Sequence, residues 1–145
     1  MEKYIGIDVG KINWDICFSN EIITLPNKLT DIRKWVRQIK KWTDIKLAIC
    51  EATGGYERVL VKTLRQEGIP ILVEHANKIR AFAKSKGLLA KTDRIDAQLI
   101  LTYANIMQPN PKDNLLSQLD ENIRDLLKRR QQLIEDKIRE IARLD

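Results

Sequence analysis

The first part of the chain alternates apolar and polar positions in short runs that turn residues separate. Residues 3–9 are β-branched and apolar, and residues 13–18 place an apolar side chain at every second position. Alternation with a period of two is typical of a half-buried strand, and Gly10 between the two runs indicates a hairpin. A third run, residues 21–25, ends at Pro26. The pattern therefore predicts three consecutive antiparallel strands.

From residue 29 to residue 42 the apolar positions recur at steps of three and four, which predicts a helix with one buried stripe. The stripe consists of Leu29, Ile32, Trp35, Val36, Ile39 and Trp42. Downstream, the sequence predicts a strand over residues 46–50, a helix over residues 56–66 and a strand over residues 69–73. A strand, a helix and a second strand in this order indicate a right-handed parallel crossover.

Two more helices are expected before a proline boundary. The first covers residues 77–86, and the second begins at about residue 92 and covers residues 92–106. Pro109 and Pro111 follow, and prolines interrupt regular structure. We therefore expect one globular domain of residues 1–111, an α/β domain in which a mixed sheet is flanked by helices.

Residues 112–145 carry a different pattern, with apolar side chains at helical spacing and charged residues between them. The apolar positions are Leu116, Leu119, Ile123, Leu126, Leu133, Ile138 and Ile141. Because no helix breaker interrupts this stretch, the pattern predicts one long amphipathic helix. Its apolar face has no evident partner within the chain, so we expect a coiled coil with a second copy as the partner.

The charge balance points to a polyanionic partner. The chain has 26 lysine and arginine residues against 20 aspartate and glutamate residues, a formal net charge of +6. The excess lies in the predicted globular domain, whereas the predicted C-terminal helix is close to neutral. Basic side chains gain affinity for nucleic acids by releasing counterions from phosphates. A solvated basic surface is the alternative, so the charge alone does not decide.

Nothing in the sequence indicates export or membrane insertion. The N-terminus lacks the apolar core and the cleavage site of a signal peptide, and no window approaches the roughly 18 apolar residues of a membrane span. Cys17 and Cys50 each lie inside an apolar, strand-like run, without CxxC spacing. We therefore expect two buried free thiols in a soluble, cytoplasmic protein.

Two acidic residues occupy strand positions. Asp8 lies within the first predicted strand, where an unpaired carboxylate is costly to bury and a cation should face it. An aspartate that serves only the adjacent turn is the alternative. Glu51 follows the strand of residues 46–50, and the carboxyl ends of parallel strands are where α/β sheets place ligands. A rim glutamate that faces water is the alternative for Glu51.

A second acidic pair, Asp93 and Asp96, lies three positions apart at the start of the predicted helix of residues 92–106. This spacing puts both carboxylates on one helical face, where they repel each other unless a metal or an arginine intervenes. A capping box, with Asp93 as the N-cap and Asp96 near the third helical position, is the competing interpretation. The two interpretations are compatible.

Two strand carboxylates and a later pair form the set that two-metal phosphoryl-transfer enzymes use. Hard oxygen ligands suit Mg²⁺ or Mn²⁺, which keep several waters and leave room for a phosphodiester. Two such ions about 4 Å apart stabilise the attacking and leaving oxygens of an in-line displacement. The candidate catalytic residues and metal ligands are therefore Asp8, Glu51, Asp93 and Asp96.

Three segments carry a resemblance to a known family. GIDVGK, CEATGGYE and, most specifically, HANKIRAFAKSKGLLAKTDRIDA resemble the DEDD transposases of insertion sequences, the IS110 family that includes the Piv/MooV invertase group. The resemblance spans essentially all of residues 1–111, and the four acids of the family motif fall on Asp8, Glu51, Asp93 and Asp96. It implies a RuvC-like (RNase H) fold, whose element order matches the predicted one. It also implies metal-dependent cleavage and transfer of DNA strands during transposition.

The resemblance further implies parts that lie beyond these residues. Members of the family continue through a coiled-coil segment into a C-terminal domain with a nucleophilic serine, and a structured bridge RNA guides them. Residues 112–145 would be the start of that linker, and the serine has no counterpart that we can assign. We therefore expect a truncated chain whose partners are DNA, a guide RNA and further copies of itself.

Basic residues near these acids are candidates for contacts with nucleic acid. Lys11, Lys91 and Arg94 flank the acids and are placed to meet a scissile phosphate, although basic neighbours of acids often only balance charge. A denser basic stretch is formed by Lys78, Arg80, Lys84 and Lys86. This stretch either binds a nucleic-acid backbone or is a solvated helix face.

Three other residues receive a structural interpretation. Trp35 and Trp42 have helical spacing and are expected in the core rather than as platforms for base stacking. The opposite face of their helix carries a second basic run, residues 33–41. His75 is the only histidine, and we expect a hydrogen-bonded structural residue rather than a metal ligand.

The leading hypothesis is thus a metal-dependent DNA transposase or recombinase domain. The alternative is a non-catalytic module that binds nucleic acid and oligomerises through its C-terminal helix. Replacing Asp93 or Asp96 by asparagine separates the two hypotheses, because binding should survive the change and any cleavage should disappear.

Overall fold

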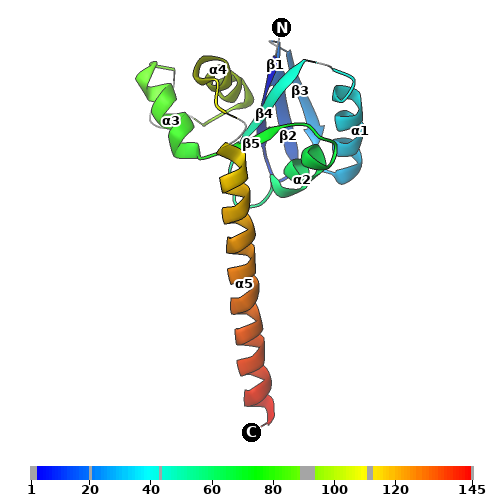
Figure 1. Cartoon of the computed structure of the whole chain (residues 1–145), viewed down its shortest axis with the longest axis vertical. Coiled ribbons are helices and arrows are strands. Elements are labelled where there is room, and N and C mark those ends of the chain that lie inside the picture. The colour runs from blue at the N-terminus through cyan, green and yellow to red at the C-terminus, as the bar shows by residue number, and fades with distance from the viewer. Residues whose placement is uncertain (1–2, 20, 43, 89–93, 111–112, 145) are drawn as a thin grey trace. The chain divides into compact units, whose positions relative to one another are not determined.

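The computed structural model describes residues 3–19, 21–42, 44–88, 94–110 and 113–144, apart from the side chains of residues 113–121. The chain falls into two compact units, Met1–Pro111 and Lys112–Asp145. The first unit contains a five-stranded sheet with helices, and the second is one long helix (Figure 1).

Three antiparallel strands open the sheet, as the alternating pattern predicts. β1 (Lys3–Val9) pairs antiparallel with β2 (Asn13–Phe18), and β2 pairs antiparallel with β3 (Glu21–Pro26). On the other side of β1, β4 (Ile45–Glu51) pairs with it in parallel, and β5 (Ile71–Glu74) pairs in parallel with β4. The order β3-β2-β1-β4-β5 places β1 at the centre of a mixed sheet.

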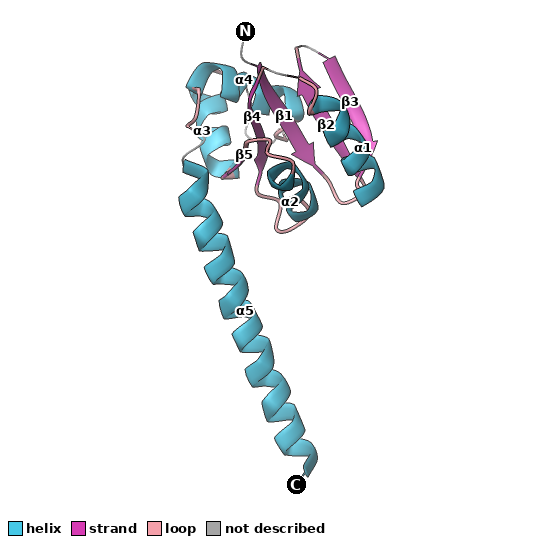
Figure 2. Ribbon diagram, turned by 45° about the vertical axis from the view of Figure 1, so that its right-hand side comes forward, coloured by secondary structure: helices cyan, strands magenta, loops and turns pink. Residues whose placement is uncertain are grey.

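Helices cover both faces of this sheet. α1 (Leu29–Ile39) and α2 (Arg58–Gln66) lie on one face, and α3 (Ala76–Ser85) and α4 (Ala97–Met107) lie on the other (Figure 2). Because both faces are covered, the central strands are apolar on both sides rather than alternating. The predicted architecture of a mixed sheet flanked by helices is therefore confirmed.

β1 directs alternate side chains to the two layers. Ile5, Ile7 and Val9 enter the core beneath α1 and α2, whereas Tyr4 enters the core beneath α3 and α4. Asp8 therefore lies on the face of the sheet that α3 and α4 cover. The candidate site is built on this face.

α4 approaches the backbone of β1 closely at Gly6. A methyl group on Gly6 would overlap the backbone of α4 at Ala97 and Leu101, so the absence of a side chain permits this approach. The contact brings the start of α4 within reach of the end of β1 that carries Asp8.

The start of α4 differs from the prediction made from the sequence. A helix was expected from about residue 92, but Arg94, Ile95 and Asp96 are not helical, and α4 begins at Ala97. Ile95 is 1% exposed, so its apolar character reflects burial of the segment before the helix rather than helical periodicity. The bounds of the other helices and strands lie close to the predicted ones.

The second unit consists of α5 (Asp113–Leu144). Its exposed large apolar residues are Ile123, Leu126, Leu127, Leu133, Ile134, Ile138, Ile141 and Leu144. Their spacing places them along one side of the helix. Neither α5 nor any other helix in the described part of the chain is long and apolar enough to cross a membrane.

Candidate metal centre

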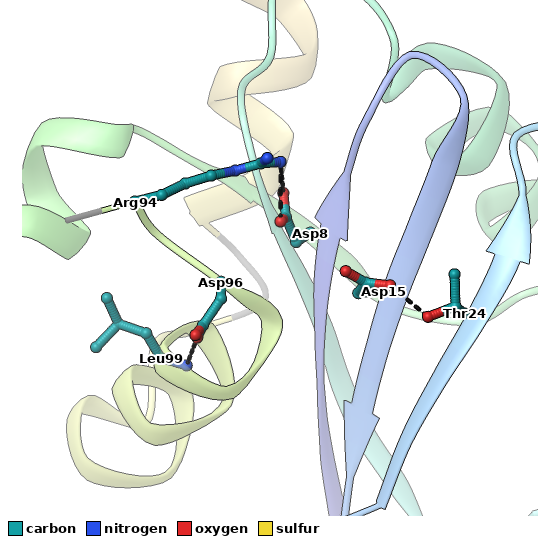
Figure 3. A network of polar contacts seen from close by, with 6 residues as sticks. All are labelled: Asp8, Asp15, Thr24, Arg94, Asp96 and Leu99. Atoms are coloured by element: carbon teal, nitrogen blue, oxygen red, sulfur yellow. Dashed lines mark hydrogen bonds and ion pairs between the residues drawn. The ribbon is translucent and has the colours of Figure 1, made fainter.

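Asp8 is a buried carboxylate that faces a guanidinium group. The residue is 6% exposed, and one terminal nitrogen of Arg94 donates to its Oδ2 at 3.1 Å and its Oδ1 at 3.4 Å (Figure 3). Burial raises the pKa of Asp8, Arg94 acts in the opposite direction, and the charges of Asp15 and Asp96 raise the pKa again. The cation that we expected at this carboxylate is therefore an arginine side chain.

Glu51 is the last residue of β4, the strand that lies beside β1. Its Oε2 atom is buried and has no hydrogen-bond partner among the described residues. Burial is the largest cause that raises the pKa of Glu51, followed by the charge of Asp8, while Arg80 and Arg94 lower it. A buried polar atom without a partner costs about 1–3 kcal/mol, and more if it is charged. Glu51 is thus more than a rim glutamate that faces water.

Asp96 is the N-cap of α4 and does not lie in its first turn. Its Oδ1 accepts a hydrogen bond from the backbone N–H of Leu99 at 2.7 Å, which satisfies one of the free N–H groups at the helix start. The capping box with Asp93 as the N-cap is therefore wrong, and so is the expectation that Asp93 and Asp96 share one helical face. Asp96 nevertheless lies close enough for its charge to raise the pKa of Asp8. Asp93 and Lys91 lie outside the described residues.

Two acids that the sequence analysis did not single out extend the site across the sheet. Asp15 on β2 is the register partner of Asp8, and its Oδ1 accepts a hydrogen bond from the Thr24 hydroxyl at 2.6 Å (Figure 3). Glu74 on β5 is the register partner of Glu51. β1 and β4 are paired up to the residues just before Asp8 and Glu51. The four carboxylates therefore form a row across four neighbouring strands.

Glu74 has protein partners for its charge. It is 5% exposed, its Oε2 accepts a hydrogen bond from the Tyr103 hydroxyl at 2.8 Å, and the Lys78 ammonium lies 3.1 Å from the same oxygen. The backbone N–H of His75 donates to Oε1 at 3.1 Å. The rule that singled out Glu51, a carboxylate at the end of a parallel strand, applies equally to Glu74 and would have found it.

The two inner carboxylates of the row differ from the two outer ones. Asp15 accepts a hydrogen bond from a hydroxyl group. Glu74 accepts one from a hydroxyl group and also pairs with an ammonium group. Asp8 depends on Arg94, and Glu51 keeps a buried oxygen without a described partner. An added cation would therefore stabilise the inner pair most.

The loop after β4 is held by a third buried carboxylate. Glu57 is 8% exposed, and its Oε2 accepts hydrogen bonds from the hydroxyl and backbone N–H of Thr53 and from the backbone N–H of Gly55. Burial acts to raise the pKa of Glu57, but these hydrogen bonds outweigh it and leave the pKa below its ordinary value. Gly54 and Gly55 have φ of 80° and 131°, as expected for a sharp turn directly after Glu51.

The residues predicted to contact nucleic acid fall into three groups. Arg94 forms the ion pair described above, and the charge of Arg80 lowers the pKa of Glu51. Lys78 is instead paired with Glu74. Lys11, Lys84 and Lys86 form the third group and are exposed, as are Lys78 and Arg94.

Of the three residues given a structural interpretation, the two tryptophans pack in or against the core, whereas His75 is exposed. Trp35 is buried, and Trp42 packs partly buried against the same cluster, with its ring centroid 4.8 Å from that of Phe18. Cys17 and Cys50 are buried free thiols, as predicted. The expected core position is therefore confirmed for Trp35, and Trp42 lies at the edge of the same cluster.

The donor set fits a hard divalent cation in its chemistry. Within the described residues, no group of three or more His, Cys, Asp and Glu side chains is arranged to hold a metal ion. Asp8 and Glu51 nevertheless offer carboxylate oxygens at adjacent positions of the sheet. Oε2 of Glu51 has no described partner, and the oxygens of Asp8 accept hydrogen bonds from the Arg94 guanidinium. Carboxylate oxygens are the ligands that Mg²⁺ and Mn²⁺ prefer.

Known proteins share both the sequence and the fold of this chain. Residues 5–145 match the IS110 family of DEDD proteins, described as transposases. The pilin gene-inverting proteins of Moraxella lacunata and Moraxella bovis are each 31% identical to the chain over 146 residues, which cover 89% of this chain and 45% of each relative. The chain thus spans less than half the length of these relatives.

Two solved structures of RuvC from Thermus thermophilus resemble this chain in fold. One, in complex with a Holliday junction substrate, has a TM-score of 0.52 at 12% identity and covers 73% of this chain and 96% of its own. The other has a TM-score of 0.50 at 13% identity and covers 72% and 96%. This likeness confirms the RuvC-like (RNase H) fold. Because the family match extends over nearly the whole sequence, the chain belongs to the IS110 family of DEDD transposases.

Proposed function

We propose that this chain cuts and transfers DNA strands at a metal centre built on Asp8 and Glu51, as the catalytic part of a transposase or recombinase. The family and the fold indicate DNA transposition or recombination. The observation that carries the metal centre is the inner pair of carboxylates, in which Asp8 is buried against Arg94 and Glu51 keeps a buried oxygen without a described partner. Asp93 and Asp96 complete the four acids of the proposed centre.

Mg²⁺ or Mn²⁺ bound by these carboxylates would activate water and stabilise the charge that develops on a phosphodiester. The fold of the chain itself positions the carboxylates. β1 and β4 hold Asp8 and Glu51 at neighbouring positions of the sheet, and the close packing of α4 on Gly6 holds Asp96 near them. Arg94, whose side chain is 76% exposed, has room to release Asp8 and to contact a scissile phosphate.

DNA is the proposed substrate of this centre. The relatives are named for inverting a pilin gene, and one RuvC structure holds a Holliday junction substrate. Positive side chains around the acids would bind the DNA backbone without reading its sequence. The proposed contacts are Lys11, Lys78, Arg80, Lys84, Lys86, Lys91 and Arg94. A guide RNA for the complete protein is supported by the family resemblance alone.

A second copy of the chain is the proposed partner of α5. In this proposal residues 1–111 are the catalytic domain, and residues 112–145 begin a coiled-coil linker. Burying an apolar helix face is favourable by about 25 cal/mol per Å² of apolar surface, and the exposed apolar side of α5 offers such a face. The variant Leu126→Glu/Leu133→Glu should sediment as a monomer at concentrations where the wild type is a dimer. A monomeric wild type would contradict this part of the proposal.

Binding of Mn²⁺ tests the centre directly. Calorimetric titration of the wild type and of Asp8→Asn/Asp93→Asn, each with and without a short branched DNA, compares chains with and without the proposed ligands. Asp31→Asn/Asp44→Asn is the control, because it removes two carboxylates that are not part of the row. Loss of binding in the double variant alone supports the centre. Equal binding in all three chains, or none even with DNA, contradicts it.

A non-catalytic binding module is the second candidate. The ion pair of Asp8 with Arg94 and the cap formed by Asp96 favour it, since each gives a proposed ligand a structural partner. The discriminating measurement is cleavage of branched DNA in Mn²⁺ by the wild type and by Asp8→Asn. A module binds the DNA equally in both chains and cleaves it in neither, whereas the enzyme loses cleavage in the variant.

A further inference from the structure

We infer that α1 carries a second nucleic-acid surface, on the layer opposite the acids. Four cations point away from the sheet, two consecutive ones followed by two at steps of three and four positions. They are Arg33, Lys34, Arg37 and Lys41, which we call the α1 stripe. All four are exposed, and the opposite side of the helix is buried in the core. The first three belong to α1. Lys41 lies in the turn that follows, where its backbone N–H donates to the Gln38 carbonyl at 3.3 Å.

Acidic neighbours do not neutralise the α1 stripe. Within α1 the one acidic residue is Asp31, whose carboxylate accepts from the Thr30 hydroxyl at 3.5 Å. Glu67, the C-cap of α2, is bound by Lys40 at 2.8 Å, a cation outside the stripe. Lys40 accounts for most of the lowering of the Glu67 pKa, and Arg37 adds only the smallest contribution. The positive charge of the stripe therefore remains directed to the solvent.

The spacing of the α1 stripe suits a phosphate backbone. Neighbours three or four positions apart on a helix are about 5–6 Å apart, and the whole stripe covers about 12 Å of helix axis. One strand of a duplex presents a charge about every 3.4 Å of axis, so the stripe matches three to four consecutive phosphates. Thr30 and Gln38 line the same shallow depression of about 570 Å³ as the four cations, and they add neutral hydrogen-bonding groups of the kind that contact phosphates.

The α1 stripe and the acids lie on different layers of the domain. α1 packs over the face of β1 that carries Ile5, Ile7 and Val9, whereas Asp8 is on the other face. The sheet therefore separates a nucleic acid bound at the stripe from a nucleic acid bound at the metal centre. A chain that uses both surfaces holds two nucleic-acid segments at once. The inference rests on the proposed function only in taking a nucleic acid as the partner.

Binding measured in chelator tests the stripe without involving the metal centre. The stripe variant is Arg33→Gln/Lys34→Gln/Arg37→Gln/Lys41→Gln, and the control, Lys3→Gln/Lys62→Gln/Lys128→Gln/Lys137→Gln, removes the same charge from exposed positions elsewhere. Fluorescence anisotropy follows a short DNA duplex and a short RNA duplex between about 50 and 200 mM salt. Glutamine has a helix propensity close to that of lysine and arginine, so the fold should be retained. Circular dichroism checks this, and Arg37→Gln/Lys41→Gln is the milder variant if four changes unfold the chain.

With at least one of the two duplexes, we expect the stripe variant to bind about 10-fold or more weakly than the control. The slope of log affinity against log salt should fall by about three to four, since each phosphate contact contributes about 0.9 for DNA and somewhat less for single strands. The duplex that responds identifies whether DNA or RNA is the partner. Equal losses in the stripe variant and the control, or no loss with either duplex, would overturn the inference.

The number of duplexes bound per chain separates this inference from the proposed metal-centre surface. We expect two short duplexes per wild-type chain and one per chain of the stripe variant, measured by stoichiometric titration at low salt. A fall from one bound duplex in the wild type to none in the stripe variant would also support the stripe. It would mean that the surface around the acids binds no duplex, which contradicts that part of the proposed function. An unchanged number would overturn the stripe whatever its value.

Discussion

Arg94 binds both carboxylate oxygens of Asp8 through one terminal nitrogen, although 86 positions separate the two residues in sequence. The side chain of Asp8 is 8% exposed and that of Arg94 is 76% exposed. The carboxylate is fixed on a central strand, whereas the Arg94 side chain is largely in solvent and contacts Asp8 through its terminal nitrogen. We therefore expect a divalent cation and Arg94 to compete for the same oxygens.

Arg94→Ala tests this competition. Without the guanidinium the charge of Asp8 is buried unpaired, so the free energy of unfolding in chelator should fall by about 1–3 kcal/mol. Mn²⁺ should bind about 10-fold more tightly, equivalent to about 1.4 kcal/mol, because no side chain has to leave first. Calorimetry and thermal unfolding with and without Mn²⁺ measure the two effects. Lys11→Ala, an exposed cation, should change neither, and weaker Mn²⁺ binding by Arg94→Ala would rule out competition.

Two substitutions at Asp96 separate its charge from its capping role. Asparagine is as good an N-cap as aspartate, so Asp96→Asn should unfold at nearly the wild-type free energy, whereas Asp96→Ala should lose about 0.5–2 kcal/mol. Both variants should bind Mn²⁺ more weakly if the carboxylate is a ligand. Urea unfolding and Mn²⁺ titration give the two quantities. Full Mn²⁺ affinity in Asp96→Asn would leave Asp96 with a capping role alone.

Glu57 makes part of the stability depend on pH. Hydrogen bonds from Thr53 and Gly55 outweigh burial and hold the pKa of Glu57 below its ordinary value of 4.5. The group therefore contributes stability that is fully present above pH 4.5 and is lost as the pH falls through the lower pKa of the folded state. Glu57→Gln should be less stable than the wild type by about 1–3 kcal/mol near neutral pH. The stability difference between the two chains should become smaller as the pH falls, and urea unfolding at several pH values measures it. A difference that stays constant with pH would contradict the role given to the Glu57 carboxylate.

Gly6→Ala should displace α4 from β1. The added methyl group overlaps the helix backbone at Ala97 and Leu101, and overpacking of this kind costs about 1–3 kcal/mol or more. Mn²⁺ binding should weaken as well, because Asp96 moves with the helix. Gly68→Ala is the control: with φ of 75° and nothing within 4 Å of the added carbon, it should cost about 1–2 kcal/mol through backbone strain alone. If Gly6→Ala bound Mn²⁺ like the wild type, α4 would not position the centre.

Local patterns in the sequence were sufficient for β1 to β5 and for α1 to α3. Burial on one side of a strand or helix imposes a period of two or of about 3.6 residues, whatever the partner is. The positions of Asp8 within a strand and of Glu51 at a strand end followed from the same patterns. The family could be inferred because consecutive residues carry its motifs, and the comparisons confirm it.

Tertiary structure decided where α4 begins. Asp93 and Asp96 offer the same capping chemistry, so nothing local favours one over the other. The structure uses Asp96, with Ile95 buried ahead of the helix and α4 packed on Gly6. The choice depends on the space above β1, which is not encoded in the residues next to the helix.

The extent of the carboxylate row was likewise decided by the tertiary structure. The sequence by itself determined which segments become strands and which acids they carry. Only the pairing of β1 with β2 and of β4 with β5 brings Asp15 level with Asp8 and Glu74 level with Glu51. Register depends on hydrogen bonds and packing between whole strands, and a shift of one residue would turn these side chains to the other face. Local pattern therefore set the strands, and contacts between distant segments set the site.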